Sequence, residues 1–341
     1  ALLSAFTQFD AQASIDFFES RGLKIKIEPE KRAFPVTDNA ADVHRVMRSY
    51  MLQHGVEVKL GSAVTGFIAK DGVIVAAKIG KSEIRAKSFI LATGGKSHPE
   101  TGSTGEGFTW LKELGHTVIE PESALVPLTV KESWVRDVAG ISLKDAKVTV
   151  FVDDKKQDAK SGKMLFTHTG VSGPLILNMS KAVGDLLESG TVQLSIDLYP
   201  SLDLGALDRN MLAIFELAAK KKIKNHIGEL VQPRLGHALL NIAKIDPETQ
   251  LSHLTRDQRM SFAKSLKDIR LTVTGLLGPE NAVVTSGGVS LKEVDFKTMQ
   301  SKLYKNLYLI GDVLDFDRPS GGFSLQICWT TGFIAGGRSG R

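Results

Sequence analysis

The sequence is poor in cysteine, since Cys328 is the only one among 341 residues. A single cysteine excludes a disulfide within the chain and a zinc site built from cysteines, and it suits a reducing compartment. No apolar run approaches the roughly 18 residues that a membrane helix needs, and the first residues lack the basic start of a signal peptide. We therefore expect a cytoplasmic protein that has no membrane partner.

The sequence also lacks a strong charge of one sign, because its net charge is only +5. The exception is a basic cluster, AAKKKIKNH from Ala218 to His226, which could contact phosphate. At the end of a predicted helix, such a cluster more often complements the helix dipole and stays solvated. Nucleic acid is therefore not the expected partner. The eight histidines show no metal-ligand spacing such as HExxH, and we expect no metal.

The composition, 42% hydrophobic and 24% charged, predicts a globular chain with a large core and two or three domains. The segment from Asn39 to Gly55 predicts an amphipathic helix with Asn39 as its N-cap. VEVKL, from Val56 to Leu60, predicts a short strand, and two strand-like runs flank a turn at Asp71-Gly72. A buried strand ending at Thr93 follows.

The middle of the chain changes character twice. Short alternating segments predict a β-rich part from Ala124 to about Pro200, with one helix after GVSGPLIL. From Leu202 to Asp268 the pattern is helical, and strand patterns then return in RLTVTG, NAVVTSGG and NLYLIG. We therefore expect an inserted module between two parts of one sheet.

Two apolar strands run directly into glycine, one at Gly94-Gly95 and the other at Gly311-Asp312. In an open α/β sheet, ligands bind beyond the carboxyl ends of the strands, and glycines there let the backbone approach a cofactor that a Cβ would block. Both strand ends are therefore expected in one sheet, beside a cofactor.

The stretch from Asn306 to Gly337 is the more informative of the two. After Gly311-Asp312 and a loop with Arg318-Pro319, Ser320-Gly321-Gly322 opens an apolar helix of small residues. An acidic side chain after a strand can accept hydrogen bonds from sugar-alcohol hydroxyls, and free N–H groups at a helix start favour an electron-rich partner. The combination suits the ribityl chain and the pyrimidine end of a flavin. The alternative is a strand-turn-helix whose glycines serve only tight packing.

Four motifs in register carry a resemblance to a known family. They are FILATGG (Phe89–Gly95), FTHTGVSGPLIL (Phe166–Leu177), VVTSGGVSLKEVD (Val283–Asp295) and IGDVLDFDRPSGGFSLQ (Ile310–Gln326). Over nearly the whole chain they resemble the flavoprotein family that includes the YhiN and BaiN proteins, also called the aminoacetone oxidase family. The resemblance implies an FAD-dependent oxidoreductase and suggests NAD(P)H as a transient electron donor.

The resemblance also implies an α/β fold: a Rossmann-like FAD-binding domain of the two-dinucleotide-binding-domain flavoprotein type, interrupted by a β-rich domain and a helical domain. The expected domains are residues 1–122 with 283–341, residues 123–200 and residues 201–282. The family begins with a βαβ unit carrying GxGxxG, which this sequence lacks. Either the chain is part of a longer protein, or it has lost tight FAD binding. We favour the first, because a loss should expose the apolar flank of the remaining sheet.

The positions matched to the family imply contacts along an FAD molecule. Residues 63–64 would meet adenine, and residues 92–95 would pass the diphosphate and adenosine side. Residues 311–312 would contact the ribityl and phosphate part, and residues 321–324 would border the flavin ring. Residues 287–288 would approach the ring or form a plain tight turn. The implied set is Ala63, Val64, Ala92, Thr93, Gly94, Gly95, Gly287, Gly288, Gly311, Asp312, Gly321, Gly322, Phe323 and Ser324.

The catalytic chemistry of a flavoenzyme belongs largely to the cofactor. The protein needs only to bind and orient the cofactor and the substrate and to exclude water, with at most one side chain acting as acid or base. His168 is the best acid/base candidate, because it lies between Thr167 and Thr169 at a predicted junction before a glycine turn. The alternative is a histidine that is hydrogen-bonded locally and shapes that turn. Cys328 lies inside the closing helix, where packing is its expected role.

Three functions follow from these observations. The first is an FAD-dependent oxidoreductase that transfers hydride between a small organic substrate, flavin and NAD(P)H or oxygen. The second is a flavin-dependent enzyme acting on RNA through the region of Lys220 to Lys222, with salt-dependent binding. The third is a non-catalytic flavoprotein-like scaffold, supported only by the missing GxGxxG unit.

Overall fold

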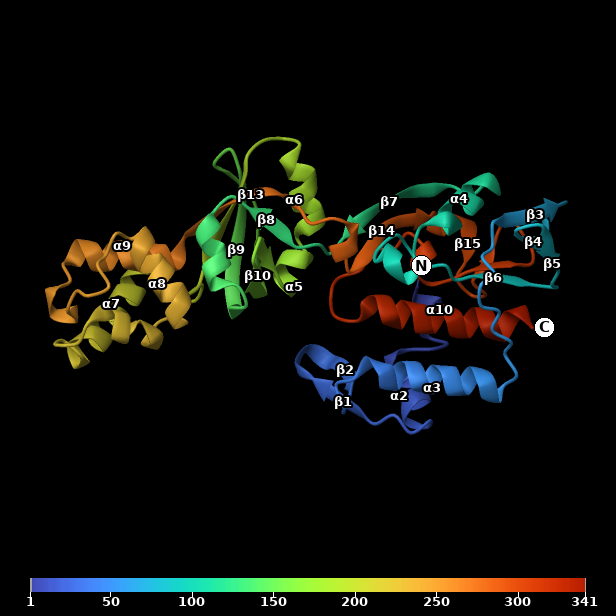
Figure 1. Cartoon of the computed structure of the whole chain (residues 1–341), viewed down its shortest axis with the longest axis horizontal. Helices are drawn as coiled ribbons and strands as arrows, with labels where there is room; N and C mark the ends of the chain where they lie inside the picture. The colour runs from blue at the N-terminus through green and yellow to red at the C-terminus, as the bar shows by residue number, and fades with distance from the viewer. Residues whose placement is uncertain (1, 341) are drawn as a thin grey trace. The chain divides into compact units, whose positions relative to one another are not determined.

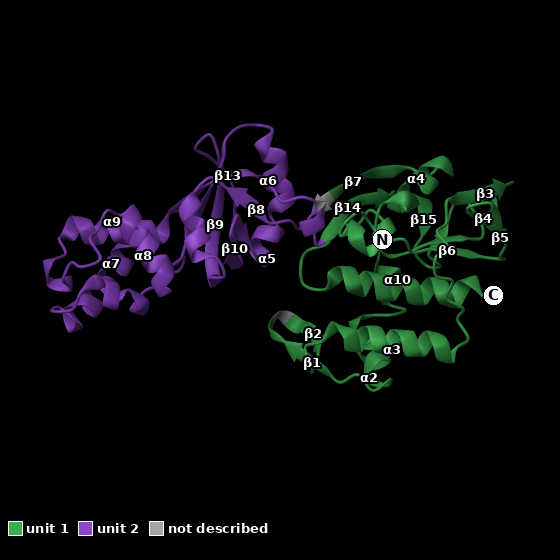
Figure 2. Ribbon diagram, viewed as in Figure 1, with its two compact units in different colours: residues 1–123, 284–341 green, residues 124–283 purple. Residues whose placement is uncertain are grey.

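The computed structural model describes residues 2–340, apart from the side chains of Glu30, Ser123 and Pro279. The chain forms two compact units, coloured separately in Figure 2. The first unit combines residues 1–123 with 284–341, and the second is the continuous segment 124–283. The second unit is therefore inserted into the first.

The first unit mixes short sheets with helices (Figure 1). Its helices are α1 (Leu3–Phe6), α2 (Ala11–Glu19), α3 (Ala40–Gln53), α4 (Glu106–Glu113) and α10 (Phe323–Ser339). Its strands are β1 (Ile25–Glu28), β2 (Arg32–Pro35), β3 (Gly66–Lys70), β4 (Val73–Ile79), β5 (Ser82–Ile84), β6 (Phe89–Leu91), β7 (Val118–Ala124), β14 (Val284–Val289), β15 (Val294–Asp295), β16 (Gln300–Ser301) and β17 (Leu307–Leu309). The short 3-10 turns used below are η8 (Leu291–Glu293) and η9 (Gly311–Val313).

The central sheet of the first unit has the order β15-β16-β17-β6. β17 and β6 are parallel, with Leu309 opposite Leu91, so their carboxyl ends lie at the same edge. The expectation that these two strands share one sheet is confirmed. β14 pairs with β7, so two separate pairings join the early and late parts of the chain across the insertion.

The long helix α10 carries the core of this unit. Ile327, Ile334 and Ala335 are buried in the same apolar cluster as Leu91 and Leu309 of the sheet. Figure 1 shows α10 between the central strands and the pair α2 and α3. The opposite flank of α10 is fixed by the Thr330 hydroxyl, which donates to the Phe9 carbonyl at 2.8 Å.

The predicted helix after Asn39 is confirmed. α3 begins at Ala40, and the Asn39 side chain accepts a hydrogen bond from the Ala41 N–H, as an N-cap does. The predicted hairpin is confirmed as well, because β3 and β4 are antiparallel around Asp71 and Gly72, both with positive φ.

The predicted strand at Val56–Leu60 is wrong. These residues form neither helix nor strand, and Val56, Val58 and Leu60 are 47%, 56% and 88% exposed. The alternation of apolar and charged residues is genuine, but a strand forms only where a second strand completes its hydrogen bonds. Among the described residues, no strand pairs with this segment.

The second unit contains a closed barrel with the strand order β10-β11-β8-β13-β12-β9. Its strands are β8 (Leu128–Val130), β9 (Ser142–Val152), β10 (Lys155–Phe166), β11 (Gly170–Ser172), β12 (Val192–Asp197) and β13 (Ile269–Leu276). Alternate residues of β12 point inward, so that Val192, Leu194 and Ile196 are fully buried.

Helices accompany the barrel in the second unit. They are α5 (Pro174–Leu177), α6 (Ser180–Leu187), α7 (Leu204–Leu217), α8 (Pro233–Ile242) and α9 (Arg256–Lys267). Residues of α7 to α9, such as Met211, Leu239 and Phe262, share one apolar core with the barrel strands. β13, which follows these helices in the chain, is itself a barrel strand. The division of this unit into domains at residues 200 and 201 stays a prediction.

No helix in the described range, residues 2–340, is both long and apolar enough to cross a membrane.

Candidate cofactor site

The ends of β6 and β17 bring two predicted segments to one edge of the sheet. Residues 92–95 follow β6, and Gly311 and Asp312 follow β17 in the turn η9. Ala92 is exposed at this edge, and the Thr93 Oγ1 is buried without a hydrogen-bond partner among the described residues. This is the edge at which open α/β sheets bind ligands.

Asp312 has one oxygen engaged and one oxygen free. Oδ1 accepts a hydrogen bond from the Ser324 hydroxyl at 2.8 Å and lies 3.3 Å from Nη1 of Arg318. The Cys328 thiol also points at Oδ1, with Sγ at 3.8 Å. Oδ2 has no partner among the described residues, and the side chain is 23% exposed. The carboxylate therefore presents an unused acceptor toward solvent.

Arg318 lies beneath Asp312 with a fully buried side chain. Its Nη1 donates to the Thr285 carbonyl at 3.2 Å, and its Nη2 donates to the Leu314 carbonyl at 2.9 Å. Its Nε is buried without an acceptor in the part of the chain that the structure describes. The sequence analysis placed this arginine only in a loop and assigned it no role.

The start of α10 lies beside Asp312. Gly322 is the N-cap with φ +90°, a left-handed conformation that favours glycine, and an added Cβ there would meet no atom within 4 Å. Phe323 is 54% exposed, and Ser324 in the first turn bonds to Asp312. The first N–H groups of a helix have no partner within the helix, so this end can face an electron-rich group.

Three of the predicted cofactor glycines are in close contact with the chain itself. A Cβ on Gly95 would lie 2.1 Å from Oγ1 of Thr285, the hydroxyl that accepts hydrogen bonds from the Lys96 and Ser97 N–H groups. A Cβ on Gly287 would lie 2.4 Å from a β7 carbonyl, and one on Gly288 would lie 2.6 Å from the Val313 carbonyl. Internal packing thus accounts for these glycines, and their contact with a flavin stays a prediction.

The remaining predicted cofactor residues lie in the same unit. Ala63 is exposed in the loop before β3, while Val64 packs against the core that contains Leu91. Gly94 and Gly321 have positive φ in the loops that follow β6 and precede α10. The contacts predicted for these four residues with the adenine, the diphosphate and the flavin ring of FAD stay predictions.

His168 lies in the other unit, exposed in the turn between β10 and β11. The turn is held by Thr167, whose N–H donates to the Gly170 carbonyl and whose Oγ1 accepts from the Gly170 N–H. His168 makes no hydrogen bond or ion pair with the described residues. The described structure shows no hydrogen bond by which the His168 side chain would shape the turn, and both the turn-shaping alternative and the acid/base role stay predictions.

Cys328 is held as a neutral thiol. Burial, and then the negative charge of Asp312, raise the pKa of the thiol to about 12. At neutral pH the sulfur therefore keeps its proton and can donate it to the Asp312 carboxylate. A reactive thiolate is not formed here.

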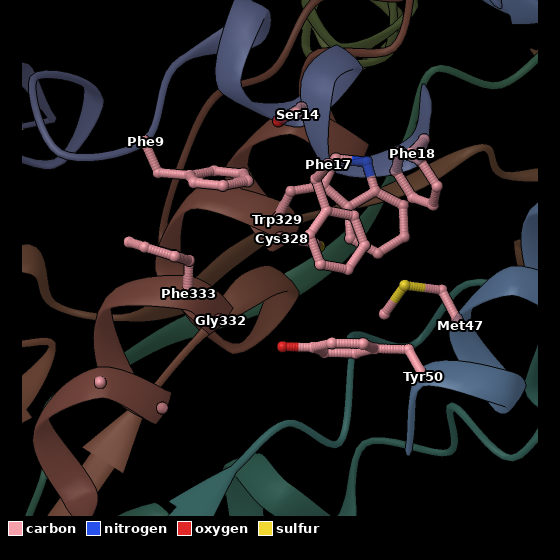
Figure 3. Close-up of a pocket in the computed structure, with 12 residues that line it drawn as sticks. Phe9, Ser14, Phe17, Phe18, Met47, Tyr50, Cys328, Trp329, Gly332 and Phe333 are labelled. Carbon is pink, nitrogen blue, oxygen red and sulfur yellow. The ribbon is translucent and has the colours of Figure 1, made fainter. Parts of the chain in front are cut away.

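An apolar cavity of about 520 Å³ adjoins the other flank of α10. Figure 3 shows its aromatic lining, which includes Phe17, Tyr50 and Trp329, with the Tyr50 hydroxyl directed into the space between them. The walls come from α2, α3 and α10 together with Phe9. Its volume lies in the range of small-molecule sites. Residues so far apart in the chain left no motif for it in the sequence.

FAD fits the residues at the sheet edge on two observations. Asp312 keeps an unused carboxylate oxygen, which can accept from hydroxyl groups of a ribityl chain. The N-terminus of α10 begins at a glycine with open space around it, where a flat ring could approach the backbone.

The chain matches a protein family described as the HI0933-like protein Rossmann domain, over residues 1–338. It is 28% identical to a 3-dehydro-bile acid delta(4,6)-reductase of Clostridium scindens over 331 residues, which cover 96% of this chain and 80% of the relative. It is 27% identical to a ribosomal RNA dihydrouridine synthase of Haemophilus influenzae over 301 residues, or 87% of this chain and 72% of the relative. The corresponding Escherichia coli protein is 26% identical over 341 residues, 96% of this chain and 78% of the relative.

Among solved structures, a flavocytochrome c3 fumarate reductase in its open conformation is similar, with a TM-score of 0.46 and 15% sequence identity. The similarity covers 99% of this chain and 65% of that chain.

Proposed function

Because the chain belongs to the HI0933-like family of FAD-dependent Rossmann flavoproteins, we propose that it is an oxidoreductase that reduces a small organic substrate with electrons from NAD(P)H. The observation that carries this proposal is the arrangement around Asp312. One oxygen is held by the protein, the other is free, and the start of α10 lies beside it, beyond the ends of two parallel strands.

The proposed substrate contains a carbon–carbon double bond conjugated to a carbonyl group. The support is that two relatives carry names describing this reduction, although on different molecules. One name is a delta(4,6)-reductase of a 3-dehydro bile acid, and the other is a synthase of dihydrouridine. In both, two hydrogens are added to a double bond that a nearby carbonyl polarises.

The protein's own residues would bind and orient the cofactor and would supply a proton to the substrate. FAD, when bound, supplies hydride transfer. Asp312 would hold hydroxyl groups of the cofactor, and the first N–H groups of α10 would face its electron-rich end. The reduction also requires a proton at the carbon next to the carbonyl. His168 is the acid proposed from the sequence, and its exposed imidazole belongs to the second unit.

An anaerobic spectroscopic experiment tests this proposal. The protein is mixed with FAD, separated from free FAD, and scanned for flavin bands before and after NADH or NADPH is added. Bleaching by one nicotinamide identifies the donor, and a cyclic enone should then restore the oxidised spectrum while it is consumed. His168→Ala should slow the enone step with little change in bleaching. Oxygen serving as acceptor while every enone fails would show an oxidase instead.

An RNA substrate is the second candidate, and it rests on the names of the Haemophilus and Escherichia relatives. The structure limits the basic cluster that it would use, because Lys222 and Lys224 form ion pairs with Glu248. Pairing of this kind favours the solvated interpretation of the cluster. Binding to ribosomal RNA with a log–log salt slope of about −0.7 to −0.9 per neutralised phosphate would favour RNA over a small molecule.

A non-catalytic scaffold is the third candidate. It predicts that a full-length version of the protein still retains no flavin after mixing and separation, so the first step of the same experiment, made on that version, decides this case. Flavin retained in a stoichiometric amount would exclude it.

A further inference from the structure

We propose that Arg318 is the positioning residue of the cofactor site, holding Asp312 so that one carboxylate oxygen is saturated by the protein and the other is left for the cofactor. This inference rests on the proposed function, because the group that would use the free oxygen is FAD. Arg318 itself is buried beneath the site and would not touch the cofactor.

The guanidinium of Arg318 connects three separate segments. Nη1 lies 3.3 Å from Oδ1 of Asp312 in η9 and donates to the Thr285 carbonyl on β14. Nη2 donates to the Leu314 carbonyl, which follows η9. Because the guanidinium is planar and two of its nitrogens donate to fixed carbonyls, its orientation toward Asp312 is fixed as well. Rotation of the Asp312 side chain would therefore leave a buried cation without its charge partner.

Asp312 is the only carboxylate that pairs with Arg318 among the described residues. The other two donors to Asp312, the Ser324 hydroxyl and the Cys328 thiol, reach the same oxygen as Arg318. Three donors on Oδ1 and none on Oδ2 define a fixed orientation of the carboxylate. An ionised carboxylate only accepts hydrogen bonds, so Oδ2 is prepared for a hydroxyl donor.

A contribution to stability alone does not explain why the Arg318 side chain is buried here. Its Nε is buried without an acceptor in the described part of the chain, which carries a cost for a polar group. An apolar side chain of similar size would avoid that cost, and buried ion pairs are often no more stabilising than apolar replacements. The geometry is therefore better explained by what it does for Asp312.

The first experiment measures FAD dissociation constants for the full chain by the change in flavin fluorescence. Arg318→Gln removes the charge, and Arg318→Lys keeps the charge but loses the fork. We expect the affinity to fall about 10- to 100-fold in R318Q and about 3- to 10-fold in R318K. The reduction potential of the bound flavin should become more negative in R318Q, because a buried positive charge has been removed.

The matched control is Arg259→Gln. Arg259 pairs with Asp208 at 2.5 Å in a partly buried contact between α9 and α7, in the other unit. R259Q should lower the stability of the protein while the FAD affinity stays within about twofold of the wild type. A loss of affinity that merely reflects a less stable protein would appear in both variants.

The second experiment needs no cofactor. A double-mutant cycle with Arg318→Gln and Asp312→Asn is measured by urea unfolding of the protein without FAD. Each single variant should lower the unfolding midpoint, and the double variant should lose less than the sum of the two, because no unpaired charge remains.

The outcomes separate the two proposals. Suppose that the wild type binds FAD, and that R318Q either binds it equally well or leaves the reduction potential of the bound flavin unchanged. Arg318 is then only structural, and the inference is overturned. Additive unfolding effects in the cycle would overturn it too. If the wild type binds no FAD, the proposed function fails first and the cofactor role of Arg318 fails with it, while the cycle still reports the Arg318–Asp312 coupling.

Discussion

Gly95 is a residue whose small size is required by a specific neighbour. An added Cβ would lie 2.1 Å from Oγ1 of the buried Thr285, which also accepts two backbone hydrogen bonds. We expect Gly95→Ala to lower the free energy of unfolding by about 1–3 kcal/mol, because neither the strand nor the loop can move freely. Urea unfolding at neutral pH measures it.

Gly336→Ala is the control for that change. Gly336 lies within α10, and a Cβ there would meet no atom within 4 Å. The substitution should raise the free energy of unfolding by about 0.5–1 kcal/mol, since alanine is the better helix former. Equal effects of the two substitutions would contradict the packing account of Gly95.

The sequence pointed to some residues of the candidate site and missed others for a physical reason. Asp312 was predicted, because an acid after an apolar strand and a glycine is a local pattern. Arg318 was not, because its burial depends on the Thr285 carbonyl, which comes from a strand far back in the chain. An arginine between Asp317 and Pro319 has the local pattern of an exposed loop residue. Only the fold turns it into a buried partner of Asp312.

At the scale of elements, a buried histidine joins the end of α4 to η8 and β16. The His116 side chain is fully buried, with Nδ1 at 2.8 Å from Glu293 and Nε2 at 3.0 Å from the Ser301 hydroxyl. The Thr117 N–H donates to Glu293 as well. Burial opposes ionisation of Glu293, but these hydrogen bonds outweigh it and hold the pKa of Glu293 below its ordinary 4.5.

The stabilisation by Glu293 should therefore depend on pH. Because its pKa is lower in the folded protein, its contribution is complete above pH 4.5 and is lost as the pH falls through the folded value. Glu293→Gln should lower the free energy of unfolding by about 1–3 kcal/mol at pH 7, and this difference from the wild type should shrink below pH 4.5. Urea unfolding at pH 7 and at lower pH measures it.

Glu113→Gln is the control, because Glu113 is exposed on α4 and its side chain forms no hydrogen bond or ion pair with the described residues. It should change the free energy of unfolding by less than about 0.5 kcal/mol at either pH. A difference between wild type and E293Q that is the same at both pH values would count against the ionised Glu293 contact.

Element prediction succeeded where the signal was local. The N-cap of α3 and the turn between β3 and β4 depend on a few adjacent residues, and both were predicted correctly. The strand predicted at VEVKL was wrong. The alternation of apolar and charged residues gives a segment the two faces of a strand, but it does not show whether another strand is available to pair with it. The cavity beside α10 could not be predicted either, since Phe9, Tyr50 and Trp329 meet only through helix packing.

At the scale of the whole molecule, the second unit should fold alone. Residues 124–283 are continuous and enclose their own barrel and core. We expect this segment, produced by itself, to unfold in one cooperative transition followed by the fluorescence of Trp134, its only tryptophan. A broad, non-cooperative transition would show that the segment depends on the rest of the chain.

A shorter segment tests the predicted division at residue 200. Residues 123–200 lack β13, which lies between β8 and β12 in the barrel. If the barrel is one unit with the helices, this segment should not fold, because the strands on either side lose their partner. A cooperative transition of residues 123–200 alone would support the separate β-rich domain that the sequence analysis predicted.

The insertion has a consequence for the protein while it is being made. β6 cannot pair with β17, nor β7 with β14, until the ribosome has translated all of residues 124–283. At about 5–20 residues per second, this delay lasts roughly 8–30 s. During that time the nascent strands expose hydrogen-bonding edges and apolar side chains such as Phe89 and Leu91. Residues 1–123, the early part of the first unit, are therefore the part of the chain expected to need a chaperone during synthesis.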